Sequence, residues 1–543
     1  MPLKQPPLKK NDDITLRIDA LTNEGGGVGR VEGYAVFVPS ALPRELVRAH
    51  VIKVTASYAV AKPLEILEPA AERVRPRCAA YPACGGCTMQ HLAYTAQLAA
   101  KERIVRDAFT RLGGFENPPL LPMRGMEEPW RYRNKGSFPF GSLDGAAVFG
   151  FYAPRSHRLV PLADCPIQDE RALDIVRRVA AWANENRIPP YDETAHTGTL
   201  RQVVARVTQS GERLAVVVTR GPLTKKAALI NALEGVESLW HNQNDQRTNV
   251  IFGERFEHIG GRRTVEERLG ALRFSVSPQS FLQVNPVQTE ALYSAALELL
   301  APAPDEAVID AYCGIGTISL LLAGRCRRVI GIEQAAPAVE DARRNALLNG
   351  VRNAEFLCGS VEELLPGLLE TARIAALVLD PPRKGCGPQA LEAIGKSGIS
   401  RLVYVSCHPA TLARDCAALA AHGFSPAAIQ PVDMFPHTGH VETVVLLSKG
   451  EIDSKKVRVE FSLEDMDMSD FQDKATYTQI KEYVLEHTGL KVSNLYISQI
   501  KRKCGLEVGK NYNLAKSEDS RQPQCPPEKE NAIREAFEYF GMI

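Results

Sequence analysis

The chain has 543 residues, which corresponds to three or four domains of ordinary size. Charged residues make up 24% and hydrophobic residues 45% of the chain, a composition that excludes a fibrous or largely disordered protein. With 65 basic and 64 acidic residues the formal net charge is +1, so the total charge indicates no nucleic-acid partner, but a local basic face would suffice to bind RNA.

Nothing in the sequence indicates a membrane or exported protein. No run of about 18 apolar residues occurs, and the first residues, MPLKQPPLKKNDD, lack the apolar centre of a secretory signal. We therefore expect a cytoplasmic location. In that reducing compartment, the twelve cysteines favour metal binding or catalysis over disulfides.

Residues 1–72 are expected to form a small β-barrel. The segments ITLRIDAL, YAVFVPSAL and LVRAHVIKV read as short strands, turns rich in Gly and Pro separate them, and no helical period is present. Barrels of this kind often bind nucleic acid, but a structural role fits the pattern equally well.

Residues 73–265 are expected to form an α+β domain that carries a cysteine cluster. A helical pattern follows the cysteines and predicts a helix over 92–114. Strand-like segments come next, among them VFGFYAP, LRQVVARVT and RLAVVVTR.

Residues 266–450 show the alternation of strands and helices that is typical of a Rossmann-like α/β domain. The continuous apolar strands are AVIDAYC, RVIGIEQ, AEFLCGS, AALVLDPP, RLVYVSC and TVVLLS, and segments of helical length separate them. We expect a parallel, doubly wound sheet, which binds its ligands at the carboxyl ends of the strands.

Residues 451–543 predict a small, mainly helical appendage. The segment TQIKEYVLEH has apolar residues at helical spacing, and Ser493 can cap a second helix that ends in Lys501-Arg502-Lys503. A third helix is expected from Pro526-Pro527 onwards. A helix-turn-helix-like module and a plain helical appendage both fit this pattern.

A glycine turn, Gly314-Ile-Gly316, lies between the apolar strand VIDAYC and a helix. Such a turn lets the backbone approach a ligand closely at a helix N-terminus. Glu333 stands nineteen residues after Gly314, at the end of the next strand, where its carboxylate can bind both hydroxyls of a ribose. Because the full GxGxxG is absent, the turn favours S-adenosylmethionine over a dinucleotide, and an ordinary glycine turn of a Rossmann-like fold is the alternative.

Three further strand ends of this domain carry reactive side chains. LDPPR places Asp380 and Arg383 after one strand, YVSCHP places Cys407 after the next, and FPHTGHVET places Glu442 at another. A cysteine is often only a small buried hydrophobe, and a lone glutamate is usually a solvated charge. Here the neighbouring motifs favour an exposed thiol beside a carboxylate.

A thiol and a carboxylate at one edge fit the methylation of C5 of uracil. That carbon is a poor nucleophile until a thiolate adds to C6, and the adduct then holds a proton on C5 that must leave before the thiol is released. The reaction needs a cysteine nucleophile and a separate general base, the roles that we assign to Cys407 and Glu442.

The sequence resembles the RNA uridine-5-methyltransferase family, whose S-adenosylmethionine-dependent members make 5-methyluridine in 23S rRNA and tRNA. The matching segments lie in family order between about 12 and 448: SFLQVNPVQTEALY, DAYCGIGTISL, GIEQ, LDPPRKGC, YVSCHPATLARD and FPHTGHVETVVLL. The resemblance identifies the first barrel as a TRAM domain, an OB-like RNA-binding module. It also implies that the helix after the cysteines packs on the catalytic domain.

The resemblance implies a set of cofactor-binding residues around the glycine turn: Gln283, Tyr312, Gly314, Thr317, Glu333, Ser360 and Asp380. It also implies that Cys407 is the nucleophile, that Glu442 accepts the proton and that Phe281 helps to hold the flipped base. Thr317 and His408 stand where many members have asparagine, which weakens any assignment of the substrate by analogy.

Four cysteines predict a metal centre. Cys78, Cys84 and Cys87 lie on one loop that contains two glycines, and Cys165 follows seventy-eight residues later. Four thiolates suit either a [4Fe–4S] cluster or a closed Zn site, and their spacing does not decide between the two. The family resemblance favours a [4Fe–4S] cluster with a structural role and the 23S rRNA branch, since the tRNA branch generally lacks these cysteines.

The segment Trp130-Arg-Tyr-Arg-Asn-Lys135 interleaves aromatic and basic residues, which suits stacking on bases and contact with phosphates. An amphipathic strand with a solvated charged face is an equal alternative. The first hypothesis for the function is a monomeric 23S rRNA 5-methyluridine methyltransferase.

Three rival functions were weighed against this hypothesis. One is the same chemistry on the tRNA T-loop. Another is a 5-methylcytosine enzyme, which is disfavoured because Arg383 stands where such enzymes usually have a cysteine. The third is a non-catalytic RNA-binding or assembly factor that retains a methyltransferase fold. For 451–543 we expect an accessory role in binding RNA or protein.

Overall fold

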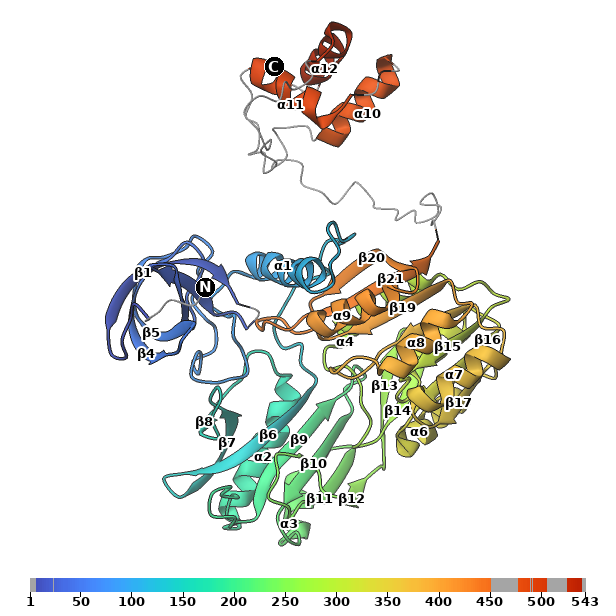
Figure 1. Ribbon diagram of the computed structural model, residues 1–543. Coiled ribbons are helices and arrows are strands. Elements are labelled where there is room, and N and C mark those ends of the chain that lie inside the picture. The colour runs from blue at the N-terminus through green and yellow to red at the C-terminus, as the bar shows by residue number, and fades with distance from the viewer. Residues whose placement is uncertain are drawn as a thin grey trace. The chain divides into compact units, whose positions relative to one another are not determined.

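The computed structural model describes residues 6–22, 24–450, 477–488, 490, 492–504 and 525–539 (Figure 1). The chain forms two compact units, Met1–Ile452 and Asp453–Ile543. The first unit contains a barrel, two seven-stranded sheets and a separate two-stranded hairpin. None of the helices in the described ranges is both long and apolar enough to span a membrane.

The N-terminal region is a closed five-stranded barrel, as the strand pattern predicts. Its strands follow the order β1-β2-β3-β5-β4. Alternate side chains such as Ile18, Val36 and Val47 fill the interior. Gly29 has a reason to be glycine, because a Cβ there would lie 2.3 Å from the carbonyl oxygen of Arg17 on the paired strand. The strands are β1 (Asp13–Leu21), β2 (Gly27–Val31), β3 (Tyr34–Val38), β4 (Leu46–Val54) and β5 (Tyr58–Glu68).

A mixed seven-stranded sheet follows, in the order β12-β11-β10-β9-β6-β7-β8. One face packs on α2, whose apolar residues Leu173, Val176 and Trp182 are buried against it. The elements are β6 (Lys135–Leu143), β7 (Ala146–Tyr152), β8 (Leu159–Pro161), α2 (Glu170–Glu185), β9 (Leu200–Val207), β10 (Arg213–Thr219), α3 (Lys226–Ala232), β11 (Ser238–Gln243) and β12 (Arg255–Gly261).

The helix after the cysteines, α1 (Tyr94–Arg111), packs on the second seven-stranded sheet. Its Val105 and Phe109 are fully buried in one apolar core with residues of that sheet. Lys101 of α1, also fully buried, forms an ion pair with Asp433, and Tyr94 donates a hydrogen bond of 2.7 Å to the same carboxylate. A buried ion pair and an apolar stripe therefore join α1 to the sheet.

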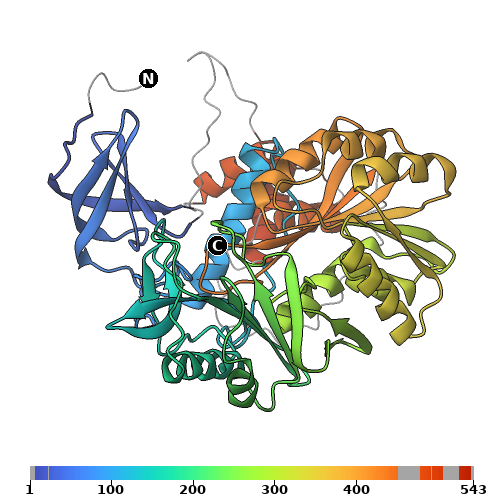
Figure 2. The ribbon, with the colours of Figure 1, turned by 90° about the horizontal axis from the view of Figure 1, so that it is seen from below.

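The second seven-stranded sheet has the order β17-β16-β15-β18-β19-β21-β20, and helices cover both of its faces (Figure 2). A hairpin, β13 (Val265–Leu269) and β14 (Leu272–Val276), precedes it. The remaining elements are α4 (Pro286–Leu300), β15 (Ala307–Ala311), α5 (Thr317–Ala323), β16 (Arg328–Glu333), α6 (Ala336–Leu348), β17 (Ala354–Cys358), α7 (Val361–Thr371), β18 (Ala376–Leu379), α8 (Pro388–Lys396), β19 (Arg401–Ser406), α9 (Pro409–Ala420), β20 (Phe424–Val432) and β21 (Glu442–Lys449).

The expectation of an all-parallel sheet is wrong for one strand, β21. Strands β15 to β19 are parallel, but β21 runs antiparallel between β19 and β20. No helix lies between β20 and β21, so the chain returns directly and the two strands pair as antiparallel neighbours. As a result, the first residue of β21 lies at the edge where the parallel strands end.

The second unit contains three helices in its described residues: α10 (Tyr477–Thr488), α11 (Asn494–Lys503) and α12 (Pro527–Tyr539). Ser493 caps α11 by accepting a hydrogen bond from the backbone N–H of Tyr496. Ile480, Ile497 and Phe537 are fully buried in a core shared by the three helices. The predicted helical appendage is confirmed, and the expected positions of its helices agree with the structure.

Candidate functional site

One face of the second sheet carries the predicted reactive residues. Val308, Val378 and Val405 on this face belong to the core formed with α4 and α5. Side chains alternate between the two faces along a strand, so Asp310, Asp380, Cys407 and Glu442 point to the same face. All four lie at or beside the edge where the parallel strands end.

Cys407 and Glu442 lie at neighbouring strand ends. Strands β19 and β21 are antiparallel, and the last pair of their register is Ser406 with Thr443. Cys407 directly follows Ser406 and Glu442 directly precedes Thr443, and the charge of Glu442 acts on the Cys407 thiol. Cys407 is half-buried, whereas Glu442 is only 3% exposed. The structure thus brings the two predicted catalytic residues together.

Burial and neighbouring like charges raise the pKa values of the ionisable side chains at this edge. Burial and then the neighbouring Asp380 raise the pKa of Glu442 to about 8, while Arg383 lowers it. Burial and then Asp310 raise the pKa of Asp380 to about 7. Burial and the carboxylate of Glu442 also raise the pKa of the Cys407 thiol. Strongly shifted carboxyls that cluster in this way are typical of functional sites.

Arg383 is a functional candidate to which the sequence reasoning gave no role. It is exposed, and its guanidinium opposes the effects of burial and of Glu442 by lowering the pKa of Cys407 through charge and hydrogen bonding. Its positive charge therefore favours the thiolate form of Cys407. Its position directly after the Asp-Pro-Pro triplet was the available signal.

The loop between β15 and α5 has the backbone shape of a ligand cradle. Tyr312, Gly314 and Gly316 all have positive φ, at 65°, 56° and 83°. Glu333 fixes this loop, because its carboxylate accepts hydrogen bonds from the backbone N–H groups of Gly314, at 3.2 Å, and of Ala335, at 2.8 Å. The glycine turn and Glu333, which are both predicted to bind the cofactor, are therefore adjacent.

The other predicted cofactor residues lie on three different segments. Thr317, the first residue of α5, donates a hydrogen bond of 3.4 Å to the hydroxyl of Tyr293, a buried residue of α4. Ser360 caps α7 by accepting from the N–H of Glu363, and Gln283 is half-buried in the segment before α4. Tyr293 is a second residue that the sequence reasoning passed over: burial and the nearby Asp380 raise its pKa.

Tyr312 turns its hydroxyl away from the loop towards α7. That hydroxyl donates a hydrogen bond of 3.0 Å to the carboxylate of Glu362. Burial, together with Cys386 and Glu362, raises the pKa of Tyr312 well above its usual range. The phenol is thus engaged within the protein, which leaves its backbone and ring face for a ligand.

Of the two interpretations of Trp130–Lys135, stacking on bases does not fit the buried Tyr132, and Trp130 is already engaged. Tyr132 is buried and donates a hydrogen bond of 3.1 Å to the carbonyl oxygen of Pro436. Trp130 stacks on His437, with ring centroids 3.8 Å apart. Burial and the nearby Arg206 lower the pKa of Lys135 to about 7. By contrast, the predicted Phe281 is 68% exposed and free to contact a base.

The four cysteines of the predicted metal centre lie within electrostatic reach of one another. Burial raises the pKa of Cys87 to about 12, and Cys165, Cys84 and Cys78 each add to this shift. In the described ranges, however, no group of three or more His, Cys, Asp or Glu side chains is arranged to hold a metal ion. Four thiols are suitable ligands for a cluster, but within the described ranges their side chains are not arranged as a metal site.

Two protein families match the chain. Residues 247–450 match the family described as tRNA (uracil-5-)-methyltransferase, and residues 7–64 match the TRAM domain. The first match contains the cofactor loop, Asp380, Cys407 and Glu442, and the second contains most of the five-stranded barrel.

Similar proteins cover most of the chain. An uncharacterized RNA methyltransferase of Halalkalibacterium halodurans is 44% identical over 454 residues, which are 82% of this chain and 99% of the relative. One of Clostridium tetani is 43% identical over 452 residues, covering 82% and 98%. The crystal structure of the Pyrococcus abyssi tRNA (uracil-54, C5)-methyltransferase with S-adenosyl-L-homocysteine is 27% identical, with a TM-score of 0.66, and covers 80% of this chain and 99% of that one.

Proposed function

The chain belongs to the RNA uracil-5-methyltransferase family, and we propose that it methylates C5 of a uridine in 23S rRNA through a covalent bond between Cys407 and C6 of the base. The observation that supports this proposal is the pairing of Ser406 in β19 with Thr443 in β21, because Cys407 follows the first of these residues and Glu442 precedes the second. The third residue, Arg383, supplies positive charge beside the thiol.

The thiolate of Cys407 begins the reaction by adding to C6 of the uracil ring. A bond forms between sulfur and C6, the C5–C6 double bond opens, and its electron pair moves to C5 and the O4 carbonyl as an enolate. Arg383 stabilises the thiolate before the addition, because it favours the charged form of Cys407. C5 then becomes nucleophilic enough to take up a methyl group.

Glu442 completes the turnover. The methylated adduct keeps a proton on C5, and the carboxylate of Glu442 removes it, so that the electron pair re-forms the C5–C6 bond and expels the sulfur. With a pKa of about 8, this carboxyl is close to the value at which a general base works best near neutral pH. After the thiolate has left, Glu442 returns the proton to water.

The carboxyl groups of this face suit a cationic cofactor. S-adenosylmethionine, when bound, supplies the methyl group from a positively charged sulfonium. The carboxyls of Asp310 and Asp380 share this face, burial raises the pKa of each to about 7, and one oxygen of Asp310 is buried without a hydrogen-bond partner. Glu333, at the end of β16, would hold the ribose, and Ser360 and Gln283 would contribute further contacts to the cofactor.

A tRNA T-loop uridine is the second candidate substrate. It is favoured by the matched family description and by the Pyrococcus abyssi structure, whose enzyme acts on tRNA. The four cysteines support 23S rRNA, because the tRNA branch generally lacks them. Mapping 5-methyluridine in 23S rRNA and tRNA from cells without this protein tests the choice: loss in 23S rRNA alone is expected, and loss in tRNA alone would contradict the proposal.

The four cysteines would hold a [4Fe–4S] cluster. Its role would be structural, because it would link Cys165 to Cys78, Cys84 and Cys87, which lie far from it along the chain. Protein purified without oxygen is expected to contain iron and acid-labile sulfide, and Cys87→Ser is expected to remove both. Cys358→Ser changes an exposed cysteine elsewhere and serves as the control. Protein that contains zinc and no sulfide would contradict this assignment.

The C-terminal unit would have an accessory role in binding RNA. The relatives from Halalkalibacterium halodurans and Clostridium tetani match 82% of this chain while 98–99% of their own length is covered, so the additional residues belong to this chain. Deletion after Lys449 is expected to weaken the affinity for rRNA while leaving methyl transfer at saturating RNA intact. Unchanged affinity would contradict this role.

A further inference from the structure

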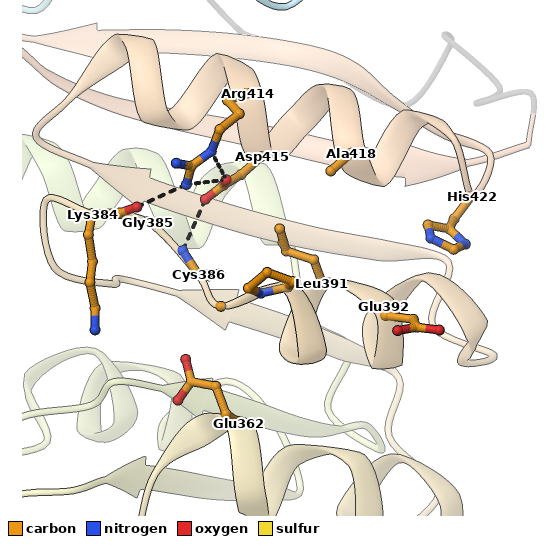
Figure 3. Close-up of a pocket in the computed structure, with 12 residues that line it drawn as sticks. Glu362, Lys384, Gly385, Cys386, Leu391, Glu392, Arg414, Asp415, Ala418 and His422 are labelled. Carbon is orange, nitrogen blue, oxygen red and sulfur yellow. Dashed lines mark hydrogen bonds and ion pairs between the residues drawn. The ribbon is translucent and has the colours of Figure 1, made fainter.

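A cavity of about 770 Å³ lies beside the loop that carries Arg383 (Figure 3). Helices α7, α8 and α9 and the segment 384–388 surround it. Asp415 of α9 stands in its wall, yet this carboxylate is only 1% exposed. A carboxylate with so little access to solvent serves the protein through the groups that it contacts.

The carboxylate of Asp415 accepts hydrogen bonds from three different segments. One oxygen, Oδ2, accepts from the backbone N–H of Cys386 at 3.0 Å and from the hydroxyl of Tyr404 at 2.7 Å. The other, Oδ1, accepts from Nε of Arg414 at 2.8 Å. The same Arg414 donates a hydrogen bond of 2.9 Å to the carbonyl oxygen of Lys384 (Figure 3). Together Asp415 and Arg414 therefore hold the backbone of the Lys384–Cys386 turn at both ends.

The turn itself is shaped to meet this carboxylate. Gly385 has a φ of 83°, and a Cβ on it would lie 2.3 Å from Oδ2 of Asp415, so only glycine allows the close approach. One turn earlier on α9, Thr411 donates a hydrogen bond of 3.0 Å to the carbonyl oxygen of Arg383. Helix α9 thus holds the backbone from the carbonyl oxygen of Arg383 to the N–H of Cys386, on the C-terminal side of the Arg383 side chain.

Helix α9 also begins immediately after the nucleophile. Pro409 is its first residue, and His408 caps it by accepting from the N–H of Thr411. Cys407 and the arginine loop are therefore attached to one short rigid element. A shift of the loop relative to this helix would change the separation of the guanidinium and the thiol without altering either residue.

We propose that Asp415 is a positioning residue, which fixes the Lys384–Cys386 turn on α9 and so holds the guanidinium of Arg383 against the thiol of Cys407. The inference rests on the proposed function, because it explains how the reactive thiolate is stabilised. Without the carboxylate, the N–H of Cys386 and the guanidinium of Arg414 lose their buried acceptor, and the turn is free to move.

The test is the pH dependence of Cys407 alkylation, measured by mass spectrometry of its peptide after treatment of the full chain with iodoacetamide. This reading needs neither RNA nor methyl donor, so its failure is distinct from a failure of the proposed function. Asp415→Asn is expected to move the midpoint upward by about 0.5–1 pH unit, because the thiolate loses a nearby positive charge. It is also expected to lower kcat for methyl transfer with little change in the KM for S-adenosylmethionine.

The matched control is Glu306→Gln. Glu306 is also a carboxylate paired with an arginine, Arg401, and accepts a backbone N–H bond from Ala303, but it lies at the opposite edge of the same sheet. It should leave the alkylation midpoint unchanged. Arg383→Gln gives the largest upward shift of the alkylation midpoint that loss of this guanidinium can cause. The double variant Arg383→Gln with Asp415→Asn should therefore show the same midpoint as Arg383→Gln alone.

Tyr404→Phe provides a milder change if Asp415→Asn fails to fold. It removes the hydroxyl that bonds Asp415 while keeping the buried ring in place. A smaller upward shift in the same direction is expected. An alkylation midpoint equal to that of the unchanged chain in a folded Asp415→Asn variant, or in Tyr404→Phe when the former does not fold, would overturn the proposal.

Discussion

Two buried carboxyl groups, Asp433 directly after β20 and Glu442 at the start of β21, have opposite surroundings. Asp433 is fully buried and forms an ion pair with Lys101, and the hydroxyl of Tyr94 donates a hydrogen bond to it. Glu442 is almost as deeply buried, but its nearest charged neighbours include the like-charged Asp380, and its pKa rises to about 8. The negative charge of Asp433 is compensated by a buried cation, whereas that of Glu442 has no full counter-charge.

The difference separates structural from catalytic use of burial. A compensated buried charge joins two elements, here α1 and the second sheet. A carboxyl left without a full counter-charge titrates near neutral pH, which is the property that a general base requires. Under the proposed function, one of these two carboxyl groups therefore serves stability and the other serves chemistry.

The largest effect is expected from removal of the thiol. Cys407→Ala should lower methyl transfer by roughly 10³-fold or more, because no other side chain can form the bond to C6. Transfer of labelled methyl groups to 23S rRNA measures this loss. Cys326→Ala, which changes a buried cysteine at the other edge of the sheet, should retain activity. A Cys407→Ala protein that methylates at the normal rate would refute the mechanism.

Breaking the compensated pair should reduce stability rather than chemistry. Lys101→Met leaves Asp433 buried without its cation and is expected to cost about 3–5 kcal/mol of the free energy of unfolding. Denaturant unfolding of the full chain measures this. The protein that remains folded should keep its rate of methyl transfer per molecule, so a loss of rate with unchanged stability would reverse the comparison.

Removing the uncompensated carboxylate should have the opposite outcome. Glu442→Gln is expected to slow turnover by roughly 10²–10⁴-fold, since the proton on C5 has no acceptor. Single-turnover kinetics should show fast methyl transfer followed by slow release. Asp433→Asn is the matched variant, and it should lower stability without slowing release. Equal release rates in the two variants would contradict the assigned roles.

The smallest effect concerns stability and pH. The pKa of Glu442 is about 8 in the folded chain and about 4.3 when unfolded, so folding favours its protonated form. That contribution is fully present below about pH 4 and is lost as the pH rises through 8. Glu442→Gln should therefore raise the Tm by a few degrees at pH 9 and leave it unchanged at pH 4. Equal Tm values of the variant and the unchanged chain at pH 9 would show that a positive charge compensates the Glu442 carboxylate.

The periodicity of the sequence predicted most of the architecture. Alternation in ITLRIDAL and similar segments predicted the barrel, and continuous apolar runs predicted the second sheet, because both patterns depend on local burial. The antiparallel direction of β21 could not be predicted in this way, since an apolar strand has the same composition in either direction. The placement of Glu442 therefore needed the register of β19 and β21.

The site was predictable where a motif carries its chemistry and less so where function depends on distant contacts. Cys407, Glu442 and the glycine turn stand in recognisable segments. Nothing in the segment around Trp130 showed that its aromatic rings would pack on His437 and beside Pro436, more than 300 residues away. The role of Arg383 likewise depends on neighbours contributed by β19, β21 and α9.

The most direct test of the central account is mass spectrometry of Glu442→Gln after incubation with rRNA and S-adenosylmethionine, followed by digestion of both protein and RNA. The account predicts a peptide containing Cys407 that carries one methylated uridine nucleotide, absent from the Cys407→Ala protein. Methylated RNA with no covalent peptide, or a uridine attached to a different cysteine, would contradict it.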